Sequence, residues 1–181
     1  MPRIDYFAII HKYILPNSPV YRVYVPHVSL VTAKALRIAA KLGLSQVQQQ
    51  FIEEAAMLHD IGIVNVKGYG ACHYRPYICH APAGREILEH EGLEQHALVA
   101  ERHIGLGIAK EEIVRQTLPL PRRDMLCESL EEKIICWADL FFSKTPERLW
   151  QEKSLAEVEQ RATRYGQRQL ALFREWRSVF E

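Results

Sequence analysis

The sequence predicts an all-α fold in a single domain, and three observations lead to this expectation. Apolar residues recur at helical spacing along most of the 181 residues. No segment shows the strict apolar–polar alternation of a half-buried strand. Several helical segments open with a serine followed three residues later by Glu or Gln, which is a capping box. Because a chain of this length can bury a sizeable core, we expect residues 1–181 to form a single-domain helical bundle.

The first part of the chain contains three expected helices. Residues 4–14 form a short helix that ends before the Pro16–Pro19 segment. Residues 20–42 form a longer helix that ends at Gly43, since a glycine after the last apolar position commonly terminates a helix. The third helix opens with the capping-box pattern at Ser45–Gln48 and continues to His59 or Asp60.

Two long loops separate the remaining elements. Residues 62–80 are rich in glycine and tyrosine, and residues 118–129 contain two prolines. Long loops in compact domains are more often functional than idle. Between and after these loops, helices are expected over residues 81–91, 93–103, 109–115, 129–143 and 154–179. A further helix start is expected at Thr145–Pro146, because proline is favoured at the first helical position.

Three separate helices place a histidine or an aspartate within an otherwise apolar face. These residues are His27, the adjacent pair His59 and Asp60, and Asp139. Each alone would more often be a hydrogen-bonded core residue than a ligand. Burying all of them without compensation would cost several kcal/mol, whereas a divalent cation would remove that cost. Imidazole and carboxylate ligands suit zinc, manganese, iron, cobalt and nickel.

The same residues lie in segments that resemble a known family. The segments are HVSLVTAKALRIAAKLG (27–43), AAMLHDIG (55–62) and SLEEKIICWADLFFSK (129–144). Their order, H…HD…D, resembles the HD-domain, HDIG-type superfamily of metal-dependent phosphohydrolases. The resemblance implies an HD-type helical core at about 20–144, with a C-terminal helical extension at about 146–179. It also implies one or two divalent ions and hydrolysis of phosphate esters.

Two further histidines resemble ligands of the subfamilies that hold a second metal, including small bacterial dinucleoside-tetraphosphate hydrolases. They are His80 and His103. With them the resemblance implies a six-residue ligand set: His27, His59, Asp60, His80, His103 and Asp139. In that arrangement Asp60 bridges two ions and acts in catalysis by orienting a water molecule or accepting its proton. In the alternative, one of the added histidines binds substrate phosphate or caps a helix.

The chain departs from the family pattern at one position that bears on substrate binding. Many HD enzymes with two metals have a lysine directly after HDIG, where this chain has Ile63. The phosphate contacts must therefore come from other basic residues. The candidates are Lys67, Arg102, Arg122, Arg123, Lys133 and Lys144. Arginine would suit phosphate because its planar guanidinium donates two parallel hydrogen bonds.

The expected function is that of a metal-dependent phosphohydrolase acting on a nucleotide or another small phosphorylated compound. A di-iron oxygenase of HD type and a non-catalytic, metal-containing nucleotide-binding module are the alternatives. A formal net charge of +1 gives no strong field for nucleic acid or anionic membrane. Nucleic acid and membrane are therefore not the expected partners. Because the N-terminal segment does not resemble a signal peptide and no window approaches the apolar length of a transmembrane helix, we expect a cytoplasmic protein.

Some features admit more than one interpretation. The last helix could pack against the core or form a homodimer. His90 and His96 are expected at the surface, and His11 is a weaker ligand candidate. A small zinc site at Cys72–His73 and Cys79–His80 is conceivable, although the spacing lacks the usual zinc-ribbon form.

Overall fold

The computed structural model describes residues 3–69 and 75–181. The expected all-α class is confirmed, since helices account for the regular structure of these residues and no strand is formed among them. The loop pair Cys72–His73 lies outside the described residues, so the small zinc site stays a prediction. The α-helices are α1 (Tyr6–Tyr13), α2 (Pro19–Lys41), α3 (Gln46–Leu58), α4 (His80–His90), α5 (Glu94–Arg102), α6 (Lys110–Arg115), α7 (Leu130–Asp139), α8 (Leu155–Tyr165) and α9 (Gln167–Phe180). Three short 3₁₀ turns are η1 (Ile61–Asn65), η2 (Tyr77–Cys79) and η3 (Pro146–Arg148).

The helix starts follow the capping patterns of the sequence. Ser45 and Ser154 each form a full capping box with the residue three positions on, and Ser129 accepts a hydrogen bond from the Glu132 amide. A side-chain cap of this kind is worth about 1 kcal/mol, because it satisfies an amide that has no partner within the helix. The expected starts of α3, α7 and α8 are therefore correct.

Three of the expected boundaries differ in the structure. The single helix expected over 154–179 is two helices, because Gly166 adopts φ +112° and breaks the backbone between α8 and α9. Only glycine adopts such a backbone conformation without strain. The start at Thr145–Pro146 yields one 3₁₀ turn, and α7 ends at Asp139 rather than near Ser143.

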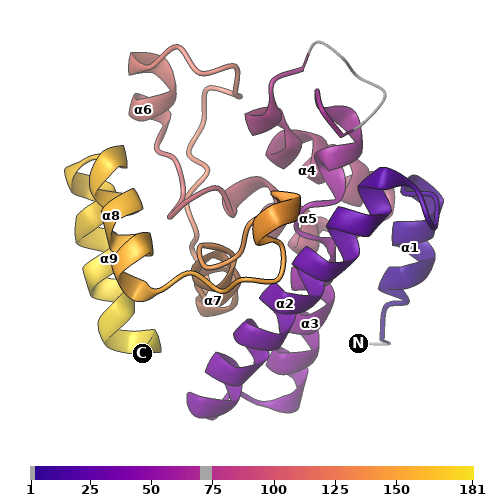
Figure 1. Ribbon diagram of the computed structural model, residues 1–181, viewed down its shortest axis with the longest axis horizontal. Helices are drawn as coiled ribbons and strands as arrows, with labels where there is room; N and C mark the ends of the chain where they lie inside the picture. Colours follow the sequence, from indigo (N-terminus) through magenta and orange to yellow (C-terminus); the bar gives the residue numbers. More distant parts are fainter. Residues whose placement is uncertain (1–2, 70–74) are drawn as a thin grey trace.

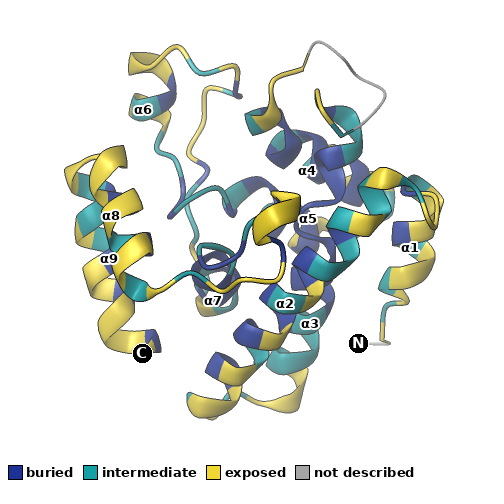
Figure 2. Ribbon diagram, in the orientation of Figure 1, coloured by how far each residue is buried: buried dark blue, intermediate teal, exposed yellow. Residues whose placement is uncertain are grey.

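Helices α2 and α3 lie side by side (Figure 1). Helix α2 packs against α3 and α7, α4 packs against α5 and η1, and α8 packs against α9. The buried residues lie on the faces that these helices turn toward one another (Figure 2). None of the described helices is long and apolar enough to cross a lipid bilayer.

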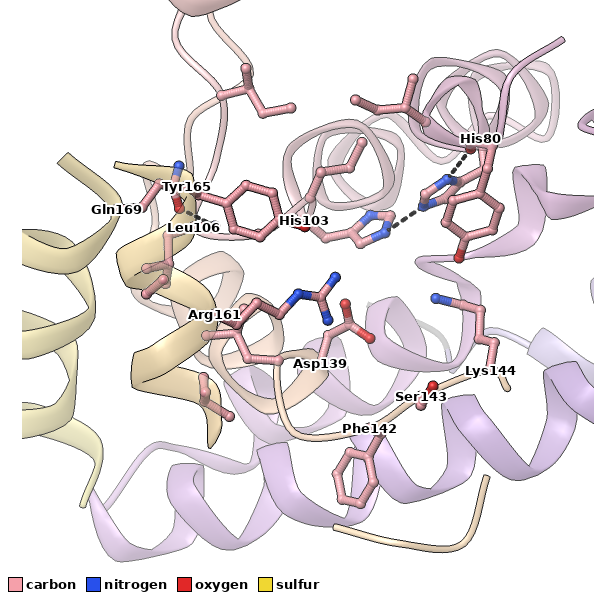
Figure 3. Close-up of a pocket in the computed structure, with 18 of the residues that line it drawn as sticks. His80, His103, Leu106, Asp139, Phe142, Ser143, Lys144, Arg161, Tyr165 and Gln169 are labelled. Atoms are coloured by element: carbon pink, nitrogen blue, oxygen red, sulfur yellow. Dashed lines mark hydrogen bonds between the residues drawn. The ribbon is translucent and has the colours of Figure 1, made fainter. Parts of the chain in front are cut away.

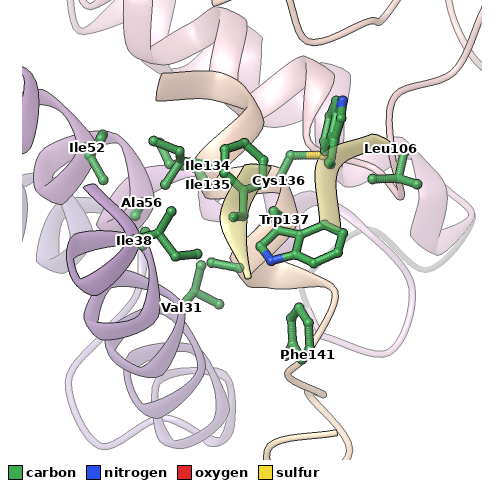
Figure 4. Packing of buried hydrophobic residues seen from close by; sticks show 14 of the residues in the cluster. Val31, Ile38, Ile52, Ala56, Leu106, Ile134, Ile135, Cys136, Trp137 and Phe141 are labelled. Carbon is green, nitrogen blue, oxygen red and sulfur yellow. The ribbon is translucent and has the colours of Figure 1, made fainter. Parts of the chain in front are cut away.

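The main core joins the C-terminal helices to the rest of the protein. Trp137 of α7 is fully buried, and its ring stacks on Phe173 of α9 with centroids 5.1 Å apart. Residues of α2 and α3 fill the other side of this core, among them Val31 and Ile52 (Figure 4). Truncating a buried tryptophan typically costs about 3–5 kcal/mol, so this contact is a main attachment of α9.

A close approach between η1 and α4 fixes the backbone around the HD pair. A Cβ atom on Gly62 would lie 2.0 Å from the His80 carbonyl oxygen and 2.3 Å from the Gly84 nitrogen. No side chain fits at that separation. Because Gly62 follows Asp60 by two residues, this contact holds His59 and Asp60 next to the start of α4.

Candidate metal centre

The six predicted ligands come together in the interior, and most of them lie at helix ends. His59 and His103 are the C-terminal caps of α3 and α5, and His80 is the first residue of α4. Asp139 is the last residue of α7, whereas His27 lies within α2. The residues at or next to these helix ends are buried, namely His59, Asp60, His80 and His103.

Backbone carbonyls orient three of the histidine rings. His59 donates from Nδ1 to the Ala56 carbonyl at 2.6 Å, and His103 donates from Nδ1 to the Ala100 carbonyl at 2.8 Å. These carbonyls lie in the last helical turn, where no amide further along the helix is available to them. His80 makes the same bond to the Tyr77 carbonyl at 2.6 Å. A proton on Nδ1 leaves the Nε2 lone pair free to bind a metal.

One set of ligand atoms surrounds the Oδ2 atom of Asp60. His27 Nε2 lies 3.1 Å from Asp60 Oδ2 and 3.0 Å from Asp139 Oδ1. His59 Nε2 lies 3.4 Å and 3.6 Å from the same two oxygens. Separations of this size between ligand atoms suit coordination of one common cation, since metal–ligand distances to N and O are about 2.0–2.2 Å.

A second set faces the other carboxylate oxygen of Asp60. His80 Nε2 and His103 Nε2 lie 3.3 Å and 3.4 Å from Oδ1, and 3.0 Å from each other. Asp60 therefore presents one oxygen to each set, which is the geometry of a bridging carboxylate. The arrangement could hold two divalent ions with Asp60 between them.

The hydrogen-bonding state of these atoms tests whether a cation fits. Both ring nitrogens of His27, His59 Nε2, both oxygens of Asp60 and Asp139 Oδ1 are buried without a hydrogen-bond partner among the described residues. An unsatisfied buried polar group costs about 1–3 kcal/mol, so several in one place need compensation. A mixed set of imidazole and carboxylate donors is also one that divalent transition metals prefer. The residues present therefore fit such an ion.

Lys144 is the one ammonium group that reaches this cluster among the described residues. Its Nζ lies 2.6 Å from Asp60 Oδ2, and the side chain comes from the loop that follows α7. Burial opposes its charge, but the carboxylates of Asp60 and Asp139 prevail and raise the pKa of Lys144 above its usual value. Lys144 is therefore a cation at neutral pH.

Burial and neighbouring charges shift the pKa values of the predicted ligands in different directions. Burial would raise the pKa of Asp60, but Lys144 and His59 hold it well below the usual value. Burial also acts on His59, where the nearby Asp60 reverses the effect and raises the pKa to about 10. At His80 burial dominates and lowers the pKa to about 3. The His80 ring is thus neutral, the form that coordinates metals.

The basic residues proposed to contact substrate lie in different surroundings. Lys67 and Lys144 line the cavity beside the cluster. Arg102 forms an ion pair with Glu132 at 3.1 Å, and Arg123 pairs with Glu101. Neither arginine is among the cavity-lining residues, nor are the exposed Arg122 and the half-buried Lys133. The structure therefore brings two of the proposed substrate-binding residues together with the ligands.

The cavity itself extends from the ligands to the C-terminal helices. Its volume is about 730 Å³, and its inner end is formed by His80, His103, Asp139 and Lys144 (Figure 3). Its outer wall includes Arg161 and Tyr165 of α8, which lie one helical turn apart. Sequence reasoning identified neither residue as part of a site, and Tyr165 is 59% exposed in the structure.

The expected surface location of His96 is wrong. His96 is buried, its Nε2 lies 3.5 Å from Glu54 Oε2, and its ring packs edge-on against Phe51 at 4.9 Å. The polar residues beside it in the sequence point elsewhere, so local composition did not reveal its burial. His90 is exposed, as expected, and His11 is exposed as well.

Comparisons with known proteins agree with this geometry. A family model described as HD domain matches residues 24–142. A tRNA (cytidine(56)-2'-O)-methyltransferase of Thermoplasma volcanium is 35% identical over 120 residues, which are 66% of this chain and 31% of the relative. An uncharacterized protein of Methanocaldococcus jannaschii is 40% identical over 108 residues, or 59% of this chain and 57% of the relative. The chain thus spans between about a third and just over half of the length of these relatives.

Two solved structures share the fold. The HD domain of the L. monocytogenes phosphodiesterase PgpH superposes with a TM-score of 0.53 at 17% identity, covering 92% of this chain and 93% of that one. The same domain in complex with cyclic-di-AMP gives a TM-score of 0.53 at 16% identity, covering 97% and 95%. At this level of identity the likeness concerns the fold.

Proposed function

This chain belongs to the HD-domain family, and from that membership and the ligand cluster we propose that it is a metal-dependent phosphohydrolase. The observation that carries the proposal is the division of the cluster into two sets that share Asp60, with unpaired Nε2 atoms in the first set and a carboxylate oxygen of Asp60 facing each set. The proposed ligands are His27, His59, Asp60, His80, His103 and Asp139. Divalent ions bound by them would lower the pKa of a water molecule, so that hydroxide is available near neutral pH.

The residues of the chain have separate roles in this proposal. Asp60 orients the attacking water or accepts its proton, since both of its oxygens face the centre of the cluster. Lys144 donates hydrogen bonds to a phosphoryl oxygen and offsets the negative charge that develops on it. Its position supports this role, because it reaches the cluster from the loop after α7 and could replace the lysine that is absent at Ile63. Lys67 would add a contact at the cavity mouth.

The proposed substrate is a nucleotide or another small phosphorylated compound. The cavity volume of about 730 Å³ lies within the range of about 300–1,000 Å³ that is usual for small-molecule sites. A neighbouring structure of the same fold contains cyclic-di-AMP, which supports a nucleotide. The methyl transfer named for one relative belongs to a protein of which the matched segment is about a third, and we do not assign it here.

We also propose that residues 1–181 form one domain, because α9 packs its Phe173 against Trp137 of the matched region. Of the arginines first proposed as substrate contacts, Arg102 and Arg123 would have to leave their carboxylate partners before binding phosphate. Arg122 and Lys133 remain candidates at the periphery, and a homodimer remains a prediction.

The first test is metal content, measured by elemental analysis on protein purified without added metal. A His59→Ala, Asp60→Ala double variant provides the comparison. We expect one or two iron, manganese, zinc, cobalt or nickel ions per wild-type chain and their loss from the variant. A wild type that binds none of these metals, even after reconstitution, would contradict the proposal.

The reaction is then tested with the metal-loaded protein. Release of phosphate from nucleotides supports hydrolysis. Iron-dependent oxygen consumption without phosphate release would instead indicate a di-iron oxygenase, since iron also accepts this donor set. Tight nucleotide binding without any product would indicate a non-catalytic binding module.

A further inference from the structure

The outer wall of the cavity comes from a part of the chain that lies beyond the matched family region. Helix α8 begins at Leu155, whereas the match ends at residue 142. One face of α8 lines the cavity with Val158, Arg161, Ala162 and Tyr165. These positions are three or four residues apart, so they lie on one side of the helix. Any selectivity that α8 provides is therefore additional to the HD core.

Arg161 differs from the other arginines near the site. It is the one arginine that lines the cavity within the described part of the chain, and it forms no ion pair or hydrogen bond with a described residue. Arg102 and Arg123, in contrast, are held by carboxylates. The Arg161 side chain extends into the cavity on the side of Asp139, across from Lys144 (Figure 3). An unpaired guanidinium in this position is suited to bind an anionic group.

Tyr165 adds an aromatic surface beside this cation. Its ring lies 5.8 Å from the Arg161 guanidinium carbon, and it is 59% exposed although it lines the cavity. Apolar side chains line the same cavity, including Leu106 and Ile104. An exposed tyrosine next to an apolar wall can stack with a planar ring, which also covers the exposed face.

We propose that α8 binds the part of the substrate that is not cleaved, and that the substrate is a nucleoside carrying at least two phosphates. Arg161 binds the second phosphate, and Tyr165 stacks on the aromatic base. This inference rests on the proposed hydrolase function, because it assumes that one phosphate lies at the metal ligands and Lys144. The cavity is large enough for both parts, since a single phosphate would fill only its inner end.

The test separates substrate binding from the chemical step. Metal-loaded full-length protein is titrated calorimetrically with adenosine 5′-(α,β-methylene)diphosphate, a diphosphate analogue that resists hydrolysis. We expect Arg161→Gln and Tyr165→Ala each to weaken binding about tenfold. Tyr165→Phe keeps the ring, and Arg164→Gln removes an exposed arginine of α8 that does not line the cavity. Both should stay within about twofold of the wild type.

Kinetics provide the second readout. Arg161→Gln and Tyr165→Ala should lower kcat/KM for ADP by a similar factor, while kcat/KM for glycerol phosphate, which has neither a ring nor a second phosphate, changes by less than about twofold. The role of α8 is overturned if these variants bind the analogue as tightly as Arg164→Gln does. Failure of the wild type to hydrolyse either compound would overturn the proposed hydrolysis instead, and the analogue titration would still decide the role of α8.

Discussion

Two buried polar clusters lie a short distance apart in this protein, and they are balanced in different ways. The Glu101 carboxylate is 1% exposed and accepts hydrogen bonds from Arg85 and Arg123, at 2.5 Å each. In the ligand cluster, acceptor atoms of His27 and Asp60 face one another without hydrogen bonds. The first cluster pairs its carboxylate with two arginines, whereas in the second the His27 ring nitrogens stay unpaired although Lys144 lies against Asp60. Burial of polar groups alone therefore does not indicate a metal site, whereas buried ring nitrogens and carboxylate oxygens that face one another without hydrogen bonds are what a bound cation would satisfy.

The largest expected difference between the two clusters is stabilisation of the folded state by a metal bound at the second one. At a free Mn²⁺ concentration a thousand times the Kd, the folded state gains about 4 kcal/mol, which raises Tm by about 8–16 °C for a chain of this size. Differential scanning fluorimetry with and without Mn²⁺ measures the shift. The His59→Ala, Asp60→Ala variant is the control and should show no shift. Equal shifts in both proteins would mean that the ion binds elsewhere.

Removing Lys144 should break the charge balance of the ligand cluster in metal-free protein. Asp60 is fully buried and would lose the ammonium that lies 2.6 Å from it. We expect Lys144→Met to lower the free energy of unfolding by about 3 kcal/mol in urea with EDTA present. Added Mn²⁺ should reduce that difference, because another cation then faces Asp60. Lys133→Met, at a half-buried lysine without an ion pair in the described structure, is the matched control.

Mutation of the Glu101 cluster should destabilise the protein less, and the effect should not depend on metal. Glu101→Ala leaves Arg123 without its carboxylate partner and Arg85 with Glu89 as its remaining one, and the side chains of Arg85 and Arg123 are 26% and 50% exposed and can be hydrated. We expect a loss of about 2 kcal/mol in urea unfolding, with unchanged metal content. The exposed Glu111→Ala serves as control. A loss of bound metal in Glu101→Ala would show that the two clusters are coupled.

The smallest effect is expected at Arg123. Because half of this side chain is exposed and Arg85 remains on Glu101, Arg123→Met should cost about 0.5–1 kcal/mol. The same variant tests the predicted substrate contact. If Arg123 leaves Glu101 to bind phosphate, KM for the nucleotide rises with little change in stability, whereas an unchanged KM assigns Arg123 to structure alone.

Sequence patterns predicted the parts of this site that depend on local features. The clustering of His27, His59 and Asp139 could be predicted because these residues interrupt apolar helical faces. The helix starts could be predicted because serine caps are local. The orientation of the His59 and His103 rings comes from backbone carbonyls three residues earlier, which any residue provides, so no sequence pattern indicates it.

The features that sequence did not reveal depend on distant partners. His96 is buried because Glu54 and Phe51 of α3 cover it. Arg161 reaches the cavity only because Gly166 ends α8 and turns α9 back against Trp137. Nothing in the residues around these positions specifies the contact, so periodicity alone assigns them to the surface or to the core.

Gly62 shows that intolerance to substitution need not indicate a chemical role. The glycine holds no ligand atom, yet any side chain there would strike the His80 carbonyl and the Gly84 amide. Displacing α4 would move His80 away from Asp60, so a single methyl group could cost as much function as loss of a ligand. In a saturation-mutagenesis screen, position 62 would be indistinguishable from the metal ligands by activity. It would separate from them only when folding is scored independently of turnover.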